Sequence, residues 1–126
     1  MKAGARLGAV IFAADHRRLA DFYAAVTDLP VRLTDSSIVV LHSDRFELVI
    51  HKLSGEQAPC DPPTPRRDSY VKLFFPVESL ASIRDKVVAF GGQIDPVDKE
   101  WSARGFRACE AIDPEGNVIQ FRQDAP

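Results

Sequence analysis

The sequence predicts an α+β fold that contains two βαβββ modules. The main observation is that an apolar strand followed by an amphipathic helix occurs twice along the chain. The same shift that places Leu7 on Val71 also places Asp15 on Ser79, which indicates an internal duplication. The chain has 126 residues and is 45% hydrophobic, which suits one domain or two small halves that share a core.

A proline-rich stretch divides the two copies. Residues 55–68 hold four of the nine prolines and show no hydrophobic periodicity, so they are predicted to be a linker. We therefore treat residues 1–126 as a single domain, with module one at residues 5–54 and module two at residues 69–123.

Module one begins with a continuous apolar run, Leu7–Phe12, which predicts a strand covered on both faces. Asp15 is predicted to cap a helix that ends near Asp28. The apolar face of this helix has helical spacing and consists of Leu19, Phe22, Tyr23 and Val26. Three further strands are predicted at Val31–Thr34, Ser37–Leu41 and Arg45–Leu53.

Module two repeats this order. Tyr70–Val77 is predicted to be its first strand, and Ser79 is predicted to cap a helix that ends at Gly91 and Gly92. The apolar face of this helix consists of Leu80, Ile83, Val87 and Phe90. The remaining strands are predicted at Gln93–Asp95, Phe106–Ile112 and Asn117–Arg122.

The charge balance excludes some classes of partner. A formal net charge of -2 provides no basic surface for nucleic acid or for an anionic membrane. The first residues match neither a signal peptide nor a membrane span, so we expect a cytoplasmic protein. Cys60 and Cys109 form no C-x-x-C pair, and we expect both to be free thiols.

Several motifs in this order resemble the vicinal oxygen chelate superfamily, which includes glyoxalase I, extradiol dioxygenases and bleomycin resistance proteins. They are Asp-His-Arg-Arg-Leu-Ala-Asp-Phe-Tyr at the first helix, Gly105-x-Arg107, and Asp-Pro-Glu-Gly-Asn followed by Val-Ile-Gln-Phe. The resemblance implies a glyoxalase/bleomycin-resistance-like fold, in which paired modules curl a mixed sheet into a cup. It also implies a second subunit that completes each cup, so we expect a homodimer.

In metal-dependent members of this superfamily, inward-facing residues of the first and last strands of each module hold a metal ion. The resemblance places the equivalent positions at Gly8, Val49, Lys72 and Gln120. Glycine and valine have no donor atom, lysine is a cation and a single amide oxygen is a weak ligand. The sequence therefore predicts no metal at these positions and no cofactor.

The strand Arg45–Leu53 alternates between two faces. Phe46, Leu48 and Ile50 are expected to face the helix, which leaves Glu47, Val49 and His51 facing the cup. His51 is either a histidine at the rim of the strand or a general base or ligand contact. His16 and His42 are expected to be in solvent.

The same parity predicts an apolar lining with a few polar groups. Val10, Phe12, Phe74 and Val118 would contact a small, partly aromatic ligand, or would simply be core residues. Lys72 or Arg122 could meet an acidic substituent, although Arg122 could also only reach solvent. Trp101 is placed in a polar loop, where it either caps the cup beside Arg104 or packs on its own module.

Two classes of function follow. The first is a binding protein of the sequestration or resistance type, which holds a small apolar or aromatic molecule without a metal. The second is an enzyme of the superfamily, of lyase, isomerase or dioxygenase type. It would use His51 or Glu110 as a base, or a metal held by other ligands. The parity of the strand that contains Glu110 stays ambiguous in the sequence.

Overall fold

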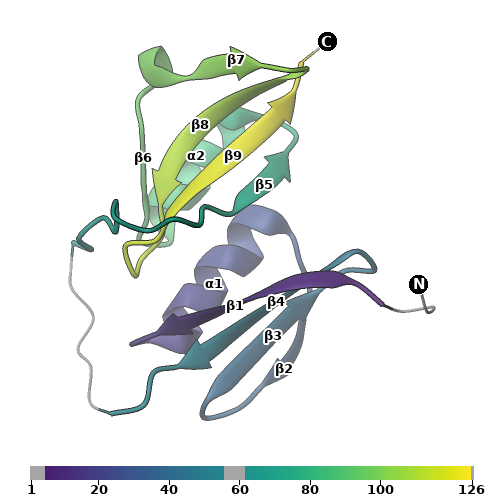
Figure 1. Cartoon of the computed structure of the whole chain (residues 1–126), viewed down its shortest axis with the longest axis vertical. Helices are drawn as coiled ribbons and strands as arrows, with labels where there is room; N and C mark the ends of the chain where they lie inside the picture. Colours follow the sequence, from purple (N-terminus) through teal and green to yellow (C-terminus); the bar gives the residue numbers. More distant parts are fainter. Residues whose placement is uncertain (1–4, 56–61, 126) are drawn as a thin grey trace. The chain divides into compact units, whose positions relative to one another are not determined.

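The computed structural model describes residues 5–55 and 62–125 (Figure 1). The chain divides into two compact units, Met1–Pro59 and Cys60–Pro126, and we describe each by itself. Each unit contains a sheet with both parallel and antiparallel strands and one α-helix, so the predicted α+β class is confirmed. Among the described residues, neither helix is long and apolar enough to cross a bilayer.

Within its described residues, the first unit has one helix and four strands. Their bounds are β1 Leu7–Ala13, α1 His16–Thr27, β2 Val31–Thr34, β3 Ile38–His42 and β4 Phe46–Lys52. The strand order in the sheet is β1-β4-β3-β2, in which β1 runs parallel to β4 and the other neighbours are antiparallel. This is the predicted βαβββ order.

Helix α1 forms where its sequence places a cap and an apolar face. The Asp15 carboxylate accepts a hydrogen bond from the backbone N–H of Arg18, which satisfies one of the free donors in the first turn. Leu19, Phe22 and Tyr23 are fully buried on the helix. Leu48 and Ile50 are fully buried on β4, and the helix contacts β4 and its neighbours. The core of this unit therefore lies between α1 and one face of the sheet.

Over residues 62–125, the second unit has one α-helix, five strands and a short 3₁₀ turn at Val97–Lys99. The bounds are β5 Phe74–Val77, α2 Leu80–Ala89, β6 Gln93–Ile94, β7 Trp101–Ala103, β8 Phe106–Ile112 and β9 Val118–Asp124. The strand order is β5-β9-β8-β6, and β7 also pairs with β8. Ile119 and Phe121 on β9 are buried on the side that α2 contacts.

The turn between β8 and β9 is held by the fully buried Asp113. Its carboxylate accepts hydrogen bonds from the backbone N–H groups of Glu115 and Asn117 and from the Asn117 side-chain amide. Gly116 has a φ of 90°, and a Cβ there would lie 2.2 Å from the carbonyl oxygen of Thr64, so only glycine fits. The Asp-Pro-Glu-Gly-Asn motif thus sets where β9 begins.

An ionic cluster joins α2, β8 and the residue that precedes β7 in the second unit. The Glu100 side chain is 8% exposed and accepts hydrogen bonds from the guanidinium groups of Arg84 and Arg107. The Arg84 hydrogen bond lowers the pKa of Glu100, burial opposes this, and the Arg107 hydrogen bond lowers it further. Arg84 also donates to the Cys109 sulfur at 3.4 Å, and burial raises the pKa of that thiol. We refer to Arg84, Glu100 and Arg107 as the Glu100 cluster.

Three sequence predictions about elements need correction. The strand predicted at Tyr70–Val77 begins only at Phe74. Because β9 begins at Val118, it offers no strand residue opposite Tyr70 and Val71. Trp101 begins strand β7 and does not lie in a loop. Residues 101–103 pair with β8, so module two has one strand more than predicted.

Two predictions about burial were wrong. The β1 strand is covered on one face only, since Val10 and Phe12 on one face are 58% and 57% exposed, whereas Ala13 on the other face is fully buried. His16 is buried, and its Nε2 lies 3.2 Å from the carbonyl oxygen of Asp35, because the turn before β3 folds back over the start of α1. Cys109 is a free buried cysteine, and Cys60 lies outside the described residues.

Candidate functional site

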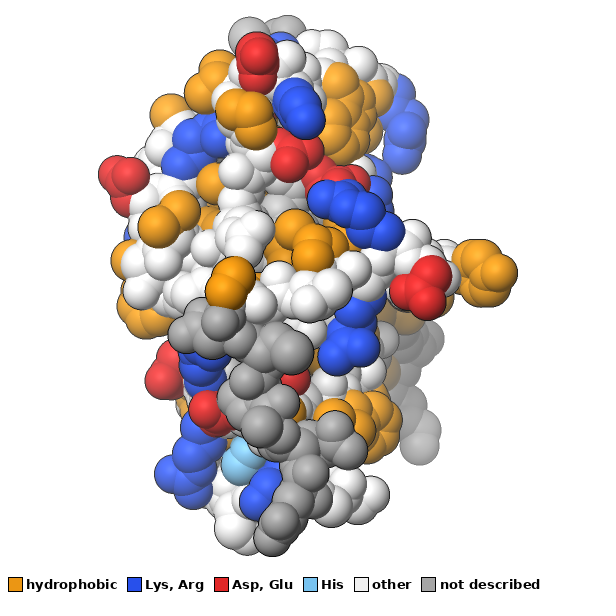
Figure 2. Space-filling model, turned by 90° about the vertical axis from the view of Figure 1, so that its left-hand side faces the viewer, with side chains coloured by type: hydrophobic (Ala, Val, Ile, Leu, Met, Phe, Trp, Pro, Cys, Tyr) orange, Lys and Arg blue, Asp and Glu red, His pale blue; other side chains and the backbone are white. Residues whose placement is uncertain are grey.

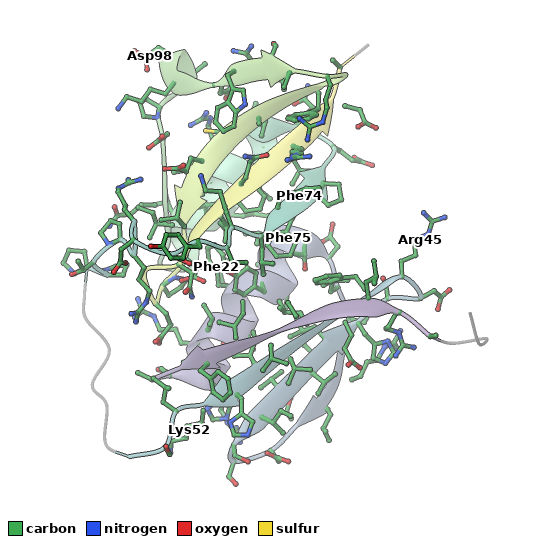
Figure 3. All side chains as sticks on the ribbon, viewed as in Figure 1. Phe22, Arg45, Lys52, Phe74, Phe75 and Asp98 are labelled. Atoms are coloured by element: carbon green, nitrogen blue, oxygen red, sulfur yellow. The ribbon has the colours of Figure 1, made fainter. Side chains whose placement is uncertain are left out.

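The face of the second sheet turned away from α2 carries most of the predicted site residues, and we call it the second open face. Phe74 on β5 pairs with Gln120 on β9, and Gln120 pairs with Glu110 on β8. Residues paired in this way project to the same side of a sheet. Phe74 is 53% exposed, whereas its neighbour Phe75 is buried; Figure 3 labels both. The pairing settles the parity of β8 and places Glu110 on this face.

Glu110 is held by two cations. Its carboxylate oxygens lie 2.7 Å from the Lys72 ammonium and 2.7 Å from the Arg67 guanidinium. Burial by itself would raise the pKa of Glu110, but the hydrogen bonds from Lys72 and Arg67 outweigh burial and hold the pKa below its ordinary value. A carboxylate in this state is a weak proton acceptor, so the geometry does not favour Glu110 as a general base.

A recess lies beside this ionic group. It has a volume of about 150 Å³ and is lined by Arg66, Arg67, Ser69, Val71, Lys72, Glu110 and Val118. The Lys72 side chain is 42% exposed and that of Arg67 is 59% exposed, so water reaches both cations. In the view of Figure 2, basic and acidic side chains are interspersed over the surface.

Arg122 occupies the centre of the second open face. Its Nε donates a hydrogen bond to the side-chain oxygen of Gln120. Its guanidinium carbon lies 3.6 Å from the ring centroid of Phe74 and 4.2 Å from that of Phe106. Because β9 lies between β5 and β8, these two rings approach Arg122 from the two neighbouring strands.

Trp101 and Arg104 lie at the β7 side of the same face. Trp101 is 37% exposed and pairs with Ala108, which in turn pairs with Arg122. The Arg104 guanidinium lies 5.2 Å from the ring centroid of Phe106. The structure therefore brings Trp101 into a row with Arg122 across β7, β8 and β9.

The first unit has a corresponding open face on β1, β3 and β4, which we call the first open face. Val10 pairs with Val49, and Phe12 pairs with His51. The rings of Phe12 and His51 lie 5.4 Å apart in a tilted arrangement. His51 Nδ1 lies 2.8 Å from the carbonyl oxygen of Lys52, and Phe12 is 57% exposed. The middle of this face is apolar, and His51 lies toward one end of it and the paired Glu47 and His42 toward the other.

The four positions that the superfamily uses for a metal do not fit one here. A Cβ at Gly8 would lie 2.5 Å from the carbonyl oxygen of Glu47, so even the first atom of a ligating side chain would clash at that position. Val49 has no donor atom. Lys72 is bound to Glu110, and the Gln120 oxygen already accepts from Arg122. Within residues 5–55 and 62–125, no three His, Cys, Asp or Glu side chains gather as a metal site.

Comparison with known proteins shows the family. The sequence model of a family described as "Glyoxalase-like domain" matches residues 8–121. The chain belongs to this glyoxalase-like family. This agrees with the resemblance of its motifs to the vicinal oxygen chelate superfamily. A search of curated proteins found no match.

Solved structures with the same fold share little sequence with this glyoxalase-like chain. A glyoxalase/bleomycin resistance protein/dioxygenase family enzyme from Burkholderia phytofirmans PsJN is 14% identical with a TM-score of 0.70, over 96% of this chain and 100% of the other. A glyoxalase/bleomycin resistance protein from Albidiferax ferrireducens T118 is 17% identical with a TM-score of 0.70, over 94% of this chain and 97% of the other. The fosfomycin resistance protein FosX from Mesorhizobium loti is 13% identical with a TM-score of 0.67, over 99% of this chain and 95% of the other. These likenesses show the glyoxalase/bleomycin-resistance fold.

Two members of the second open face are absent from the sequence prediction. Arg67 lies in the predicted linker, and no periodicity marks it as a partner of Glu110. Phe106 lies in the strand of ambiguous parity, so its ring could not be assigned to either face. Phe106 could have been found by pairing Glu110 with Gln120, since a residue four positions from Glu110 shares its face.

Proposed function

We propose that this glyoxalase-like protein binds a small apolar or aromatic molecule without a metal, in the manner of a sequestering or resistance protein. The supporting observation is the set of contacts at Lys72 and Gln120, the two positions of the second module that are equivalent to metal-ligand positions in the superfamily. Lys72 is held by a carboxylate and Gln120 by a guanidinium, and the exposed ring of Phe74 lies beside them. A site of this kind offers stacking surface and hydrogen bonds in place of a Lewis acid.

The aromatic side chains supply the contact area for such a ligand. Phe74 and Trp101 are both partly exposed on the second open face, while Phe106 is nearly buried beneath Arg122 and Arg104. Rigid rings contact a planar ligand at a small cost in conformational entropy. The first open face adds Val10, Phe12, Val49 and His51 as further candidate contacts, and their part in binding stays a prediction.

The single tryptophan makes binding directly measurable. We would titrate the full chain with the neutral probe naphthalene-2-carboxamide and follow Trp101 fluorescence, with and without a chelator. We expect saturable binding that the chelator leaves unchanged, and Phe74→Ala should weaken it by about tenfold, as for loss of a stacking contact of about 1.4 kcal/mol. Phe90→Ala is the matched control, because Phe90 is a partly exposed ring at the end of α2.

The outcomes separate the two classes of function. Binding that disappears with the chelator and returns with a divalent cation would replace the proposal with a metal-dependent activity. The absence of any saturable binding to this probe would remove the proposed function.

We also propose that the protein forms a homodimer. The exposed apolar side chains of Val10 and Phe12 support this, since both lie on the same face of the edge strand β1 and an apolar strand surface in water favours a partner. Light scattering at micromolar concentration should report twice the monomer mass, and a monomer would contradict the proposal.

A further inference from the structure

Four cations contribute to the second open face, Lys72, Arg67, Arg104 and Arg122, and two of them already have a carboxylate. Glu110 is bound by Lys72 and by Arg67. Arg122, in contrast, forms no ion pair with any described carboxylate. The sequence suggested either Lys72 or Arg122 as the group that meets an acidic substituent. The ion pairs favour Arg122, because Lys72 is already paired with Glu110.

The Arg122 guanidinium is fixed in a way that leaves one edge for a ligand. Gln120 accepts from Nε, and the rings of Phe74 and Phe106 contact the planar group. No described residue accepts a hydrogen bond from its two terminal nitrogens. A planar guanidinium that is held in place loses little entropy when it binds, and its two terminal N–H groups match the two oxygens of a carboxylate.

The surroundings of Arg122 favour a planar anion with an aromatic body. Trp101, Ala108 and Arg122 form one row, and the small, fully buried Ala108 separates the indole from the guanidinium. Adjacent strands are about 4.8 Å apart, so Trp101 and Arg122 are roughly 10 Å apart at the backbone. A ring with its carboxyl group fits this spacing. A tetrahedral phosphate would place oxygens outside the guanidinium plane, toward the two phenyl rings.

We propose that Arg122 is the residue that selects the ligand, and that the ligand is an aromatic carboxylate bound through a two-fold hydrogen bond to its guanidinium. Gln120 is a positioning residue, because it acts by holding Arg122. Lys72 and Arg67 serve to hold Glu110. This inference rests on the proposed function, since it assigns the chemical class of the molecule bound on the same face.

The test compares naphthalene-2-carboxylate with naphthalene-2-carboxamide, which differ only in the charged group. Affinities for the full chain are measured by calorimetry and by Trp101 fluorescence. We expect the acid to bind at least about tenfold more tightly than the amide, as for a hydrogen bond to a charged group. Arg122→Gln should remove this preference and leave the affinity for the amide within about twofold.

Three further variants keep the test decisive. Arg122→Lys retains the charge but loses the planar fork, so the preference should fall to a few-fold at most. Arg104→Gln removes the other guanidinium that contacts Phe106 and should leave the preference intact. Lys72→Met should leave it intact as well, because the Lys72 ammonium is already paired with Glu110. Thermal unfolding of each variant confirms that it is folded.

The inference is overturned if the acid preference survives Arg122→Gln, if Lys72→Met abolishes it, or if acid and amide bind equally to the unchanged chain. These results would leave the proposed function in place, because the amide still binds. If neither compound binds, the proposed function fails and this inference fails with it.

Discussion

The two open faces occupy equivalent positions in the two modules but have different chemistry. On the first, the row across β1, β4 and β3 consists of Val10, Val49 and Val40. On the second, the row across β5, β9 and β8 consists of Phe74, Gln120 and Glu110. The backbone pairing is the same in both rows. The two modules therefore share a strand register, while the side chains of the second row are more polar.

Ionic contacts show the same difference. In the described part of the first unit, Arg6 and Glu47 form a long ion pair of 3.7 Å. The second unit has the Glu100 cluster on the side of α2 and the Lys72–Glu110–Arg67 group on the opposite face. We therefore expect charge to matter for the stability of the second unit and much less for that of the first.

We expect Glu100→Gln to cause the largest loss in the free energy of unfolding. Removing this buried carboxylate leaves Arg84 and Arg107 without their anion, and loss of one partner of a buried ion pair typically costs about 3 kcal/mol. Chemical denaturation followed by Trp101 fluorescence measures the change. Glu78→Gln is the matched control, because Glu78 is exposed beside the same helix, and it should change stability by less than about 0.5 kcal/mol. An equal effect of the two substitutions would show that the Glu100 cluster contributes nothing.

We expect Gly8→Ala in the first unit to cause the next largest loss in the free energy of unfolding. The added methyl group would lie 2.5 Å from the Glu47 carbonyl oxygen, so β1 and β4 must separate, at a cost of about 2 kcal/mol. Hydrogen exchange should show loss of protection in β1 and β4. Lys72→Ala, at the equivalent position in the second unit, introduces no clash and is expected to cost less. If the Gly8→Ala variant is as stable as the unchanged chain and its hydrogen exchange is the same, β1 and β4 can move apart at Gly8 and Glu47 without cost, and the prediction is wrong.

Acidification should destabilise the second unit before the first. The folded-state pKa values of Glu100 and Glu110 are both lowered, so their stabilising contribution is complete above the pKa of an unfolded glutamate, about 4.3, and is lost as pH falls through the lowered values. The pKa of Asp35 in the first unit is also lowered, chiefly by the Ser37 backbone amide, but this carboxylate lies in an exposed turn.

Hydrogen exchange at about pH 7 and about pH 3.5 distinguishes the two units. We expect protection to fall first in β8 and β9, and the double variant Glu100→Gln, Glu110→Gln to show a weaker pH dependence than the unchanged chain. Earlier loss of protection in β3 and β4 would contradict the assignment of acid sensitivity to the second unit.

The smallest change in stability is expected from Glu110→Val. Glu110 and Val40 occupy equivalent positions in the two rows, so this substitution makes the second open face match the first at that position. Lys72 and Arg67 are both substantially exposed, so water replaces the lost carboxylate and the cost should stay below about 1 kcal/mol. Thermal unfolding measures it, with Glu47→Gln as the control for a long, exposed pair. A cost above about 3 kcal/mol would mean that Glu110 is a structural residue of the second unit.

The sequence by itself determined both helices and every strand except β7, in their observed order, because the signals for them are local. Asp15 and Ser79 cap the two helices as predicted, through hydrogen bonds that span three residues. Strand β8 was predicted at its observed bounds, and β9 within two residues. The poor donor set at Gly8, Val49, Lys72 and Gln120 could also be derived from the sequence, once the motifs had suggested which positions to compare.

Tertiary structure decided the faces and the partners, because these depend on strand pairing between residues far apart in the chain. Periodicity could not assign Glu110 to a face, and its pairing with Gln120 does. Arg67 lies 43 residues from Glu110 in the chain, in a stretch without periodicity, and only the fold brings its guanidinium to the carboxylate. Arg122 was expected at the cup with its charge free for a ligand or for solvent. Because β9 lies between β5 and β8, the rings of Phe74 and Phe106 and the side-chain amide of Gln120 all contact the Arg122 guanidinium and hold it in place.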